Sequence, residues 1–184
     1  DVHQIQTIFS RADTDFPSGD TPHVIILDGV HHLYFTGHYE SDQVPLMAIG
    51  HASSVDGINW TVDQGPVLEA TGDPDDWNGF LVAEPGAVVR DGQVWLYFVA
   101  FQGATVAGEP PQKSTIGLAI APDGVTFSEQ IMVLDQELSG VWPRSEGFAG
   151  FSTPSAVLRT DSGGQEWTHL TCDVAAYDAN NYRP

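Results

Sequence analysis

Basic residues are scarce in this sequence. Among its 184 residues, 6 Lys and Arg stand against 25 Asp and Glu, which gives a formal net charge of −19. A chain this acidic repels the phosphates of nucleic acids, so we expect no nucleic-acid partner. The sequence also lacks a run of about 18 uncharged apolar residues, so we expect no membrane span. Such acidity is typical of proteins in salty or extracellular water. We therefore expect an extracellular or periplasmic protein. The alternative is that the acidity is a feature of the protein's family that says nothing about its environment.

Cysteine is nearly absent as well. Cys172 stands alone in the sequence, which excludes an intrachain disulfide and a thiolate metal cluster, and we expect it to be a small buried hydrophobe. The sequence has no glycine-rich phosphate loop, no Gly-x-Ser-x-Gly elbow and no Cys/His metal spacing, so we predict no cofactor. The acidic run at 73–76 is expected to be a solvated loop, and a structural calcium ion bound by its oxygens is the alternative.

What the sequence does contain is an internal repeat. Residues 22–35 recur 63 residues later as 85–98, with Asp-Gly and Leu-Tyr-Phe in register and no gap. Residues 49–61 recur as 116–128, again with an Asp-Gly pair at the same place. A third copy opens at Pro154 and continues through a turn at 161–164. Self-similarity of this length indicates a repeat architecture.

Each copy predicts four short strands. In the first copy they are expected at 24–27, 33–36, 46–52 and 60–61, with hairpin turns at the Asp-Gly pairs, which tolerate the positive φ that tight turns need. Four antiparallel strands repeated along a chain are typical of the blades of a β-propeller. We therefore predict an all-β fold of the propeller type. A β-sandwich is the rival, but it does not explain the repeat.

The length of the repeat sets the expected number of blades. A period of about 65 residues fits a 184-residue chain about two and a half times, whereas closed propellers have about 4–8 blades. We expect one domain with blades at 20–72 and 82–136, a partial blade at 151–184, and a closing strand within 1–19. Open edges of a repeat rarely stay uncovered. Two explanations remain open: a longer parent chain, or a homodimer that completes the ring.

Three segments resemble a known group of enzymes. The run from Asp20 through Pro22 to Phe35, the run Ser-Val-Asp-Gly-Ile-Asn-Trp at 54–60, and the segment from Trp77 to Pro85 are similar to the blade motifs of the five-bladed propeller glycoside hydrolases of families 43, 32, 68 and 117. The resemblance covers nearly the whole chain and identifies the superfamily better than the individual family. It implies a glycoside hydrolase that acts on an extracellular glycan.

The resemblance also implies a catalytic site, with carboxylates at the starts of successive inner strands. Asp20 matches the first position and Glu84 the second, whereas the third holds Ser152 and Thr153, and Glu146 lies a few residues earlier. Asp20, Glu84 and Glu146 are thus the candidate catalytic residues, because glycoside hydrolysis needs two carboxyl groups that flank the bond. A turn-capping role is the alternative for Asp20. Without the third acid, a non-catalytic carbohydrate-binding or assembly module is the alternative function.

Four further residues are candidates for contact with a carbohydrate ligand. Trp77, Trp142 and Phe148 could stack on a sugar ring, and His23 could line the channel between the inner strands. Packing between blades is the alternative for the three aromatic residues, as a structural role is for His23. By contrast, His31 and His32 are adjacent in an expected strand, so they point to opposite faces and cannot bind one metal together.

Overall fold

The computed structural model describes residues 10–40, 45–103, 114–135, 148–178 and 181–183. Strands dominate this part of the chain, and the short 3₁₀ turn η1 (Arg11–Asp13) is the one helical element among the described residues. The expected all-β class is therefore confirmed. None of the helical structure in these ranges is long and apolar enough to cross a membrane.

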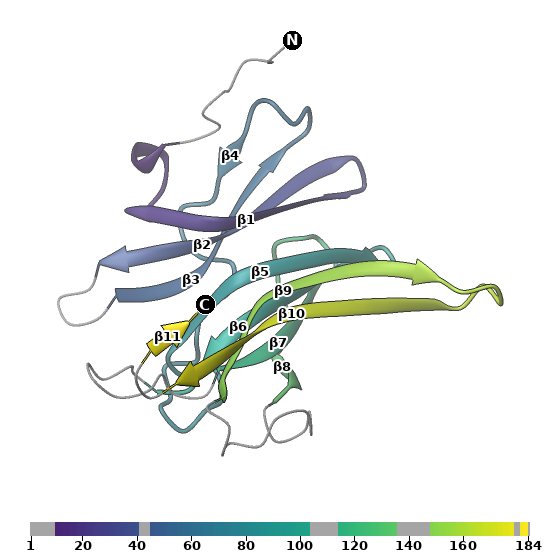
Figure 1. Ribbon diagram of the computed structural model, residues 1–184. Coiled ribbons are helices and arrows are strands. Elements are labelled where there is room, and N and C mark those ends of the chain that lie inside the picture. The colour runs from purple at the N-terminus through teal and green to yellow at the C-terminus, as the bar shows by residue number, and fades with distance from the viewer. Residues whose placement is uncertain (1–9, 41–44, 104–113, 136–147, 179–180, 184) are drawn as a thin grey trace, which may run out of the picture.

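The first repeat forms a four-stranded antiparallel sheet, here called the first unit. Its strands lie in the order β1 (Ser18–Leu27), β2 (Val30–Glu40), β3 (Pro45–Ser54) and β4 (Thr61–Val62), each paired with the next (Figure 1). All four strands predicted from the sequence are present. The first three run further than predicted, because polar residues continue each strand beyond its apolar centre.

The second repeat has the same arrangement and forms the second unit. It comprises β5 (Leu81–Arg90), β6 (Gln93–Phe101), β7 (Ser114–Ala121) and β8 (Ile131–Leu134), again antiparallel in chain order. The third unit comprises β9 (Phe148–Thr160), β10 (Glu166–Asp178) and β11 (Asn181–Arg183), and one parallel pair between Ser114 and Gly150 joins it to β7. The number of blades and their limits as a domain stay predictions. Of the segment 1–19, which is expected to hold the closing strand, residues 1–9 lie outside the described residues, and residues 10–17 contain η1 and no strand.

The Asp-Gly pairs between inner and second strands form the predicted hairpin turns. Asp28 and Asp91 have φ of 49° and 53°, and the glycines that follow them have φ of 82° and 70°. Two consecutive residues with positive φ are the requirement of the type I′ turn, whose twist matches that of the flanking strands. The repeated Asp-Gly pair thus fixes the register of each inner hairpin.

Alternation along the second strands gives each unit two apolar faces. In the first unit Leu33 and Phe35 lie on one side, which we call the front face, and Tyr34 lies on the other, the back face. The back face of the first unit packs on the front face of the second, where Leu96 and Phe98 are fully buried. We call this contact the first junction.

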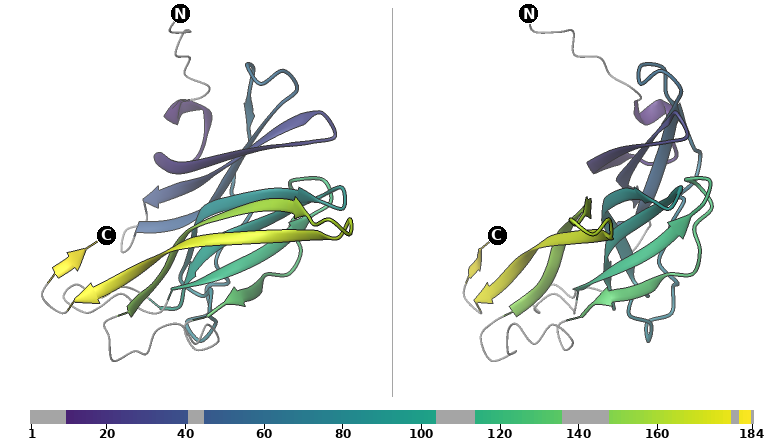
Figure 2. Two further views of the ribbon diagram at one scale, coloured as in Figure 1. Left: turned by 45° about the vertical axis from the view of Figure 1, so that its right-hand side comes forward. Right: turned by 90° about the vertical axis from the view of Figure 1, so that its right-hand side faces the viewer.

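A second junction follows the same rule. Residues on the back face of the second unit, such as Tyr97 and Ile116, pack against Phe151 and Ala156 of the third unit. The three units therefore follow one another front to back, with the first sheet and the β9–β10 hairpin at the two ends of the series (Figure 2). The inner strand β5 contacts both β1 and β9.

Candidate functional site

The three inner strands share a distorted position. Thr21, Glu84 and Thr153 have φ of 45°, 54° and 49°, and each comes directly before a proline. A residue before proline is normally restricted to extended conformations, so a left-handed backbone there is strained. The strand pairing shifts register at each of these places. Recurrent strain at equivalent positions of three strands marks this end of the inner strands as a candidate site.

This equivalence revises the relation between the two predicted carboxylates. Glu84 occupies the left-handed position that Thr21 occupies in the first unit, whereas Asp20 is equivalent to Ala83 and Ser152. The two acids lie on neighbouring inner strands, as expected, but they are one residue out of register with each other. Their side chains therefore leave the backbone from different positions of the bulge.

The carboxylate of Asp20 is held on both oxygens. Its Oδ2 atom lies 3.2 Å from Nε2 of His38, and its Oδ1 atom accepts a hydrogen bond of 3.3 Å from the hydroxyl of Thr21. The side chain is nevertheless 59% exposed. Asp20 thus combines a fixed orientation with access to solvent, as a group that contacts a ligand requires.

A chain of hydrogen bonds connects Asp20 to the second unit. The hydroxyls of Thr21 and Thr36 lie 2.6 Å apart, and Thr36 Oγ1 accepts a bond of 2.8 Å from the backbone amide of Glu84. Thr21 gives its only hydroxyl proton to Asp20, so Thr36 must donate to Thr21. All donors therefore point one way, from the amide of Glu84 to the carboxylate of Asp20, an arrangement in which each bond strengthens the next.

The side chain of Glu84 reaches the third unit. Its Oε2 atom accepts a 2.5 Å hydrogen bond from the backbone amide of Thr153, the left-handed residue of β9. Arg90, the nearest basic residue along the strand, instead lies beside Asp91 and over the ring of Trp95. Glu84 therefore links two inner strands through one carboxylate oxygen, and it is only partly buried.

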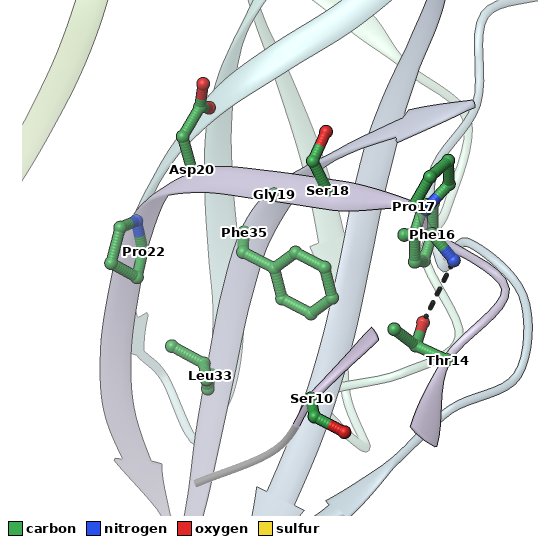
Figure 3. Close-up of a pocket in the computed structure, with 10 residues that line it drawn as sticks. All are labelled: Ser10, Thr14, Phe16, Pro17, Ser18, Gly19, Asp20, Pro22, Leu33 and Phe35. Carbon is green, nitrogen blue, oxygen red and sulfur yellow. Dashed lines mark hydrogen bonds between the residues drawn. The ribbon is translucent and has the colours of Figure 1, made fainter. Parts of the chain in front are cut away.

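A cavity of about 350 Å³ lies beside Asp20 (Figure 3). Phe16, Leu33, Phe35 and Pro22 supply its apolar surface. Asp20 is also among the lining residues, but its side chain points away from these rings, to the back face of the first unit, where Thr36 and His38 lie. Its remaining lining residues are polar or small: Ser10, Thr14, Pro17, Ser18 and Gly19. This size and this mixture of aromatic and polar groups are typical of small-ligand sites.

Two of the residues predicted to contact a ligand make structural contacts. His23 Nε2 lies 2.9 Å from the carbonyl oxygen of Ala87 across the first junction, and burial lowers the pKa of His23. Trp77 stacks on Phe98 with ring centroids 6.1 Å apart and packs against the core of the same junction. These contacts agree with the structural alternative for both residues, whose predicted ligand contacts stay untested.

Three other predicted site residues lie wholly or partly outside the described residues. Glu146 and Trp142 lie outside the described residues, and Phe148 begins β9 with its side chain likewise outside them. In the acidic loop, Asp73 uses its side chain to accept from the amide of Asp75, which shapes the turn. The described residues contain no group of three metal-binding side chains. The structural calcium ion stays a prediction.

Sequence reasoning missed the main polar cluster of the first junction. Nδ1 of buried His32 lies 3.0 Å from Nε2 of His51, whose Nδ1 lies 2.9 Å from Asp63. Because Asp63 is an acceptor, His51 carries its proton on Nδ1 and accepts from His32. Burial is the main cause that lowers the pKa of both histidines. The signal in the sequence was a buried-strand pattern that places His32 on the same face of β2 as Tyr34, and His51 is the residue opposite Tyr34 in β3.

The opposite orientations of His31 and His32 are confirmed. His32 lies in the junction, whereas the ring of His31 is 6.3 Å from that of Trp60 on the other face. Thr36 and His38, which position Asp20, were also missed. Thr36 had a weak signal as a polar residue that follows an apolar run, and His38 had none.

Comparison with known proteins was negative at the level of sequence and positive at the level of structure. No family model and no curated protein matches the chain. A family 117 glycoside hydrolase of the marine bacterium Zobellia galactanivorans has a TM-score of 0.56 at 17% identity and covers 86% of this chain and 52% of its own. A glycosyl hydrolase of Bacteroides ovatus has a TM-score of 0.53 at 13% sequence identity, and the match covers 87% of this chain and 46% of that chain. A thermostable family-43 glycoside hydrolase has a TM-score of 0.54 at 16% sequence identity, and the match covers 88% of this chain and 55% of that chain.

These similarities establish the fold. Over 86% to 88% of its length the chain has the fold of these glycoside hydrolase structures, and this is the fold that the resemblance in the sequence implied. The chain spans about half the length of these solved structures.

Proposed function

We propose that this protein is carbohydrate-active, and that it is a glycoside hydrolase acting on an extracellular glycan. The observation that carries the proposal is the geometry of Asp20. Its carboxylate is held by Thr21 and His38, remains exposed, and lies on an inner strand that contacts the strand of Glu84. A fixed, exposed carboxylate can contact the hydroxyl groups of a sugar, and a second carboxylate on a neighbouring strand is the other group that glycoside hydrolysis needs.

In the proposed reaction two carboxyl groups flank the glycosidic bond. One donates a proton to the leaving oxygen, and the other, ionised, activates water or attacks the sugar carbon. We assign the attacking or water-activating role to Asp20, whose two carboxylate oxygens are oriented by Thr21 and His38. Glu84, whose Oε1 atom is not needed for the bond to Thr153, or Glu146 supplies the proton. Trp142 and Phe148 are the proposed ring-stacking residues, and no cofactor is proposed.

A carbohydrate-binding module without catalysis is the second candidate, and a specific observation favours it. One carboxylate oxygen of Glu84 already accepts a hydrogen bond from the backbone amide of Thr153. The equivalent positions of the third inner strand, Ser152 and Thr153, carry no carboxylate. A site with Asp20 alone binds a sugar but lacks the partner that hydrolysis needs.

Release of reducing ends from a panel of plant, algal and bacterial polysaccharides tests the proposal. We expect activity in the wild type and a loss of about 100-fold or more in Asp20→Asn and Glu84→Gln, because each removes an acid–base group but keeps the hydrogen-bonding shape. Asp91→Asn, in an exposed hairpin turn, is the matched control and should retain full activity. Glycan binding without product release would favour the binding module. Absence of both would refute the proposal.

Two accessory expectations belong to the same proposal. We place the protein outside the cell or in the periplasm, on the basis of its net charge of −19, and fractionation of the native host would test that placement. If the acidic loop at 73–76 binds a structural calcium ion, chelation with EDTA will lower the melting temperature, and added calcium will restore it.

A further inference from the structure

The internal repeat shows how each front face is covered. In the second unit, Ala87, Leu96 and Phe98 form part of the front face and are 3%, 0% and 0% exposed, because the back face of the first unit packs on them. The third unit repeats this arrangement, with Ala156 buried against the second. A front face of this protein is therefore built to receive the apolar back face of another unit.

The front face of the first unit is only partly covered. Val24 takes the position of Ala87 but is 49% exposed, and Ile26, two residues further on, is 55% exposed. Beside them, Leu33 and Phe35 are buried because Phe16, on the segment that precedes β1, packs against this face. The segment thus covers the part near Phe35 and leaves the part near Val24 and Ile26 open.

The back face at the other end of the series is open too. Val157 of β9 and Trp167 of β10 are 47% and 54% exposed. Alternation puts Val157 on the side opposite Ala156, which packs on the second unit. The two ends of the series therefore present two complementary kinds of surface, an open front face and an open back face.

We propose that a second copy of this chain occupies both surfaces, so that the back face of the third unit of each copy packs on the front face of the first unit of its partner. The front-to-back rule of the two junctions selects this pairing over front to front. A two-fold axis makes both new contacts equivalent and closes the assembly.

Charge gives the proposed dimer a recognisable signature. Each chain carries a net charge of −19, so the copies repel each other while apolar contacts hold them together. Salt screens the repulsion between charges more than about 8–10 Å apart. The dimer is therefore expected to strengthen as salt rises from 20 to about 300 mM, whereas an association based on ion pairs would weaken.

Light scattering on the full chain measures the assembly. We expect a mass twice the 19.8 kDa of the chain at micromolar concentration, and a weakening of at least about tenfold in Ile26→Asp and in Val157→Asp, since each buries a charge in the contact. Ile58→Asp is the matched control. Ile58 lies in a turn and is 56% exposed. Its equivalent in the second unit, Val125, stays exposed although the first unit packs on the front face of that unit, so the proposed contact should leave Ile58 exposed as well. A monomeric wild type at high salt, or Ile26→Asp with unchanged association, would overturn the proposal.

Disulfide trapping distinguishes the two possible pairings. In a Cys172→Ser background, Ile26→Cys and Val157→Cys proteins are oxidised separately and as a mixture. Front-to-back docking predicts cross-linked dimers in the mixture and few in either protein alone. Cross-linking of Ile26→Cys with itself would instead indicate front-to-front association, which contradicts the proposal.

Discussion

The two junctions between units use different means to hold adjacent sheets. The first buries a polar cluster inside its apolar contact: Tyr34 donates 2.7 Å to the carbonyl of Gly124, and His32, His51 and Asp63 form a hydrogen-bonded series. The second relies on close approach. A Cβ atom on Gly86 would lie 2.1 Å from the carbonyl oxygen of Pro154. The stability of the first junction should therefore depend on the protonation of its histidines, and that of the second junction on the size of the side chain at its close contact.

This contrast arises from single residues in equivalent places. His23 stands in the first unit where Gly86 stands in the second, and it reaches across its junction to a backbone carbonyl instead of letting the strands approach. The same architecture thus admits a polar and an apolar solution. The four predictions below test that contrast, from the largest expected effect to the smallest.

Gly86→Ala should produce the largest effect. The added methyl group meets backbone atoms of β9, which cannot move aside as a side chain could, so we expect a loss of about 3 kcal/mol in the free energy of unfolding. Urea unfolding measures it. Gly65→Ala is the control, because nothing lies within 4 Å of its Cβ position, and it should change stability by less than about 0.5 kcal/mol. Equal effects of the two variants would refute close packing at the second junction.

Tyr34→Phe should have the next largest effect. It removes the donor to the carbonyl of Gly124 in a fully buried place, and a buried acceptor without a partner costs about 1–3 kcal/mol. The comparison variant Tyr97→Phe lies on the back face of the second unit, where Thr168 is the partner and is only partly buried. We expect a smaller loss there, of about 1 kcal/mol or less, because water can replace the tyrosine. A larger loss in Tyr97→Phe would reverse the comparison.

The pH dependence of stability should come from the first junction. Burial holds the pKa of His32 and His51 below the ordinary value of 6.5, so the unfolded chain binds protons at a higher pH than the folded chain. The stability that this difference supplies is present above pH 6.5 and is lost as pH falls below it. Urea unfolding between pH 7.5 and 5 measures the slope. His51→Gln should flatten it, because it removes one of the two histidines whose pKa is lowered by burial.

The sequence predicted the repeated elements better than the site. Apolar alternation and the Asp-Gly pairs suffice for the strands and turns, because these depend on neighbours within a few residues. The orientation of Asp20 depends on His38 and Thr36, which are brought to it by strand register rather than by a local motif. The left-handed backbone at Thr21, Glu84 and Thr153 was unpredictable from residue type, because proline normally excludes it.

The smallest expected effect concerns the charge beside the histidines. Asp123 accepts hydrogen bonds from the amides of Val125 and Thr126, which lower its pKa to about 2, and its negative charge favours protonation of His32 and His51. Asp123→Asn keeps an acceptor oxygen in the turn but removes the charge. The pKa of both histidines should fall further, and the loss of stability between pH 6.5 and 5 should become steeper.

The equivalent residue in the first unit provides the control for this change. Asp56 accepts from the amides of Ile58 and Asn59 in the same kind of turn, and it is not among the charges that act on the two histidines. Asp56→Asn should therefore leave the slope between pH 6.5 and 5 as it is in the wild type. Histidine titrations by NMR would separate the two variants directly. The His51 titration could instead shift equally in Asp56→Asn and in Asp123→Asn. That result would contradict the prediction, because it would mean that the excess of carboxylates in the whole chain sets the protonation of the histidines. The charge of Asp123, in the turn that faces them across the first junction, would then have no special effect.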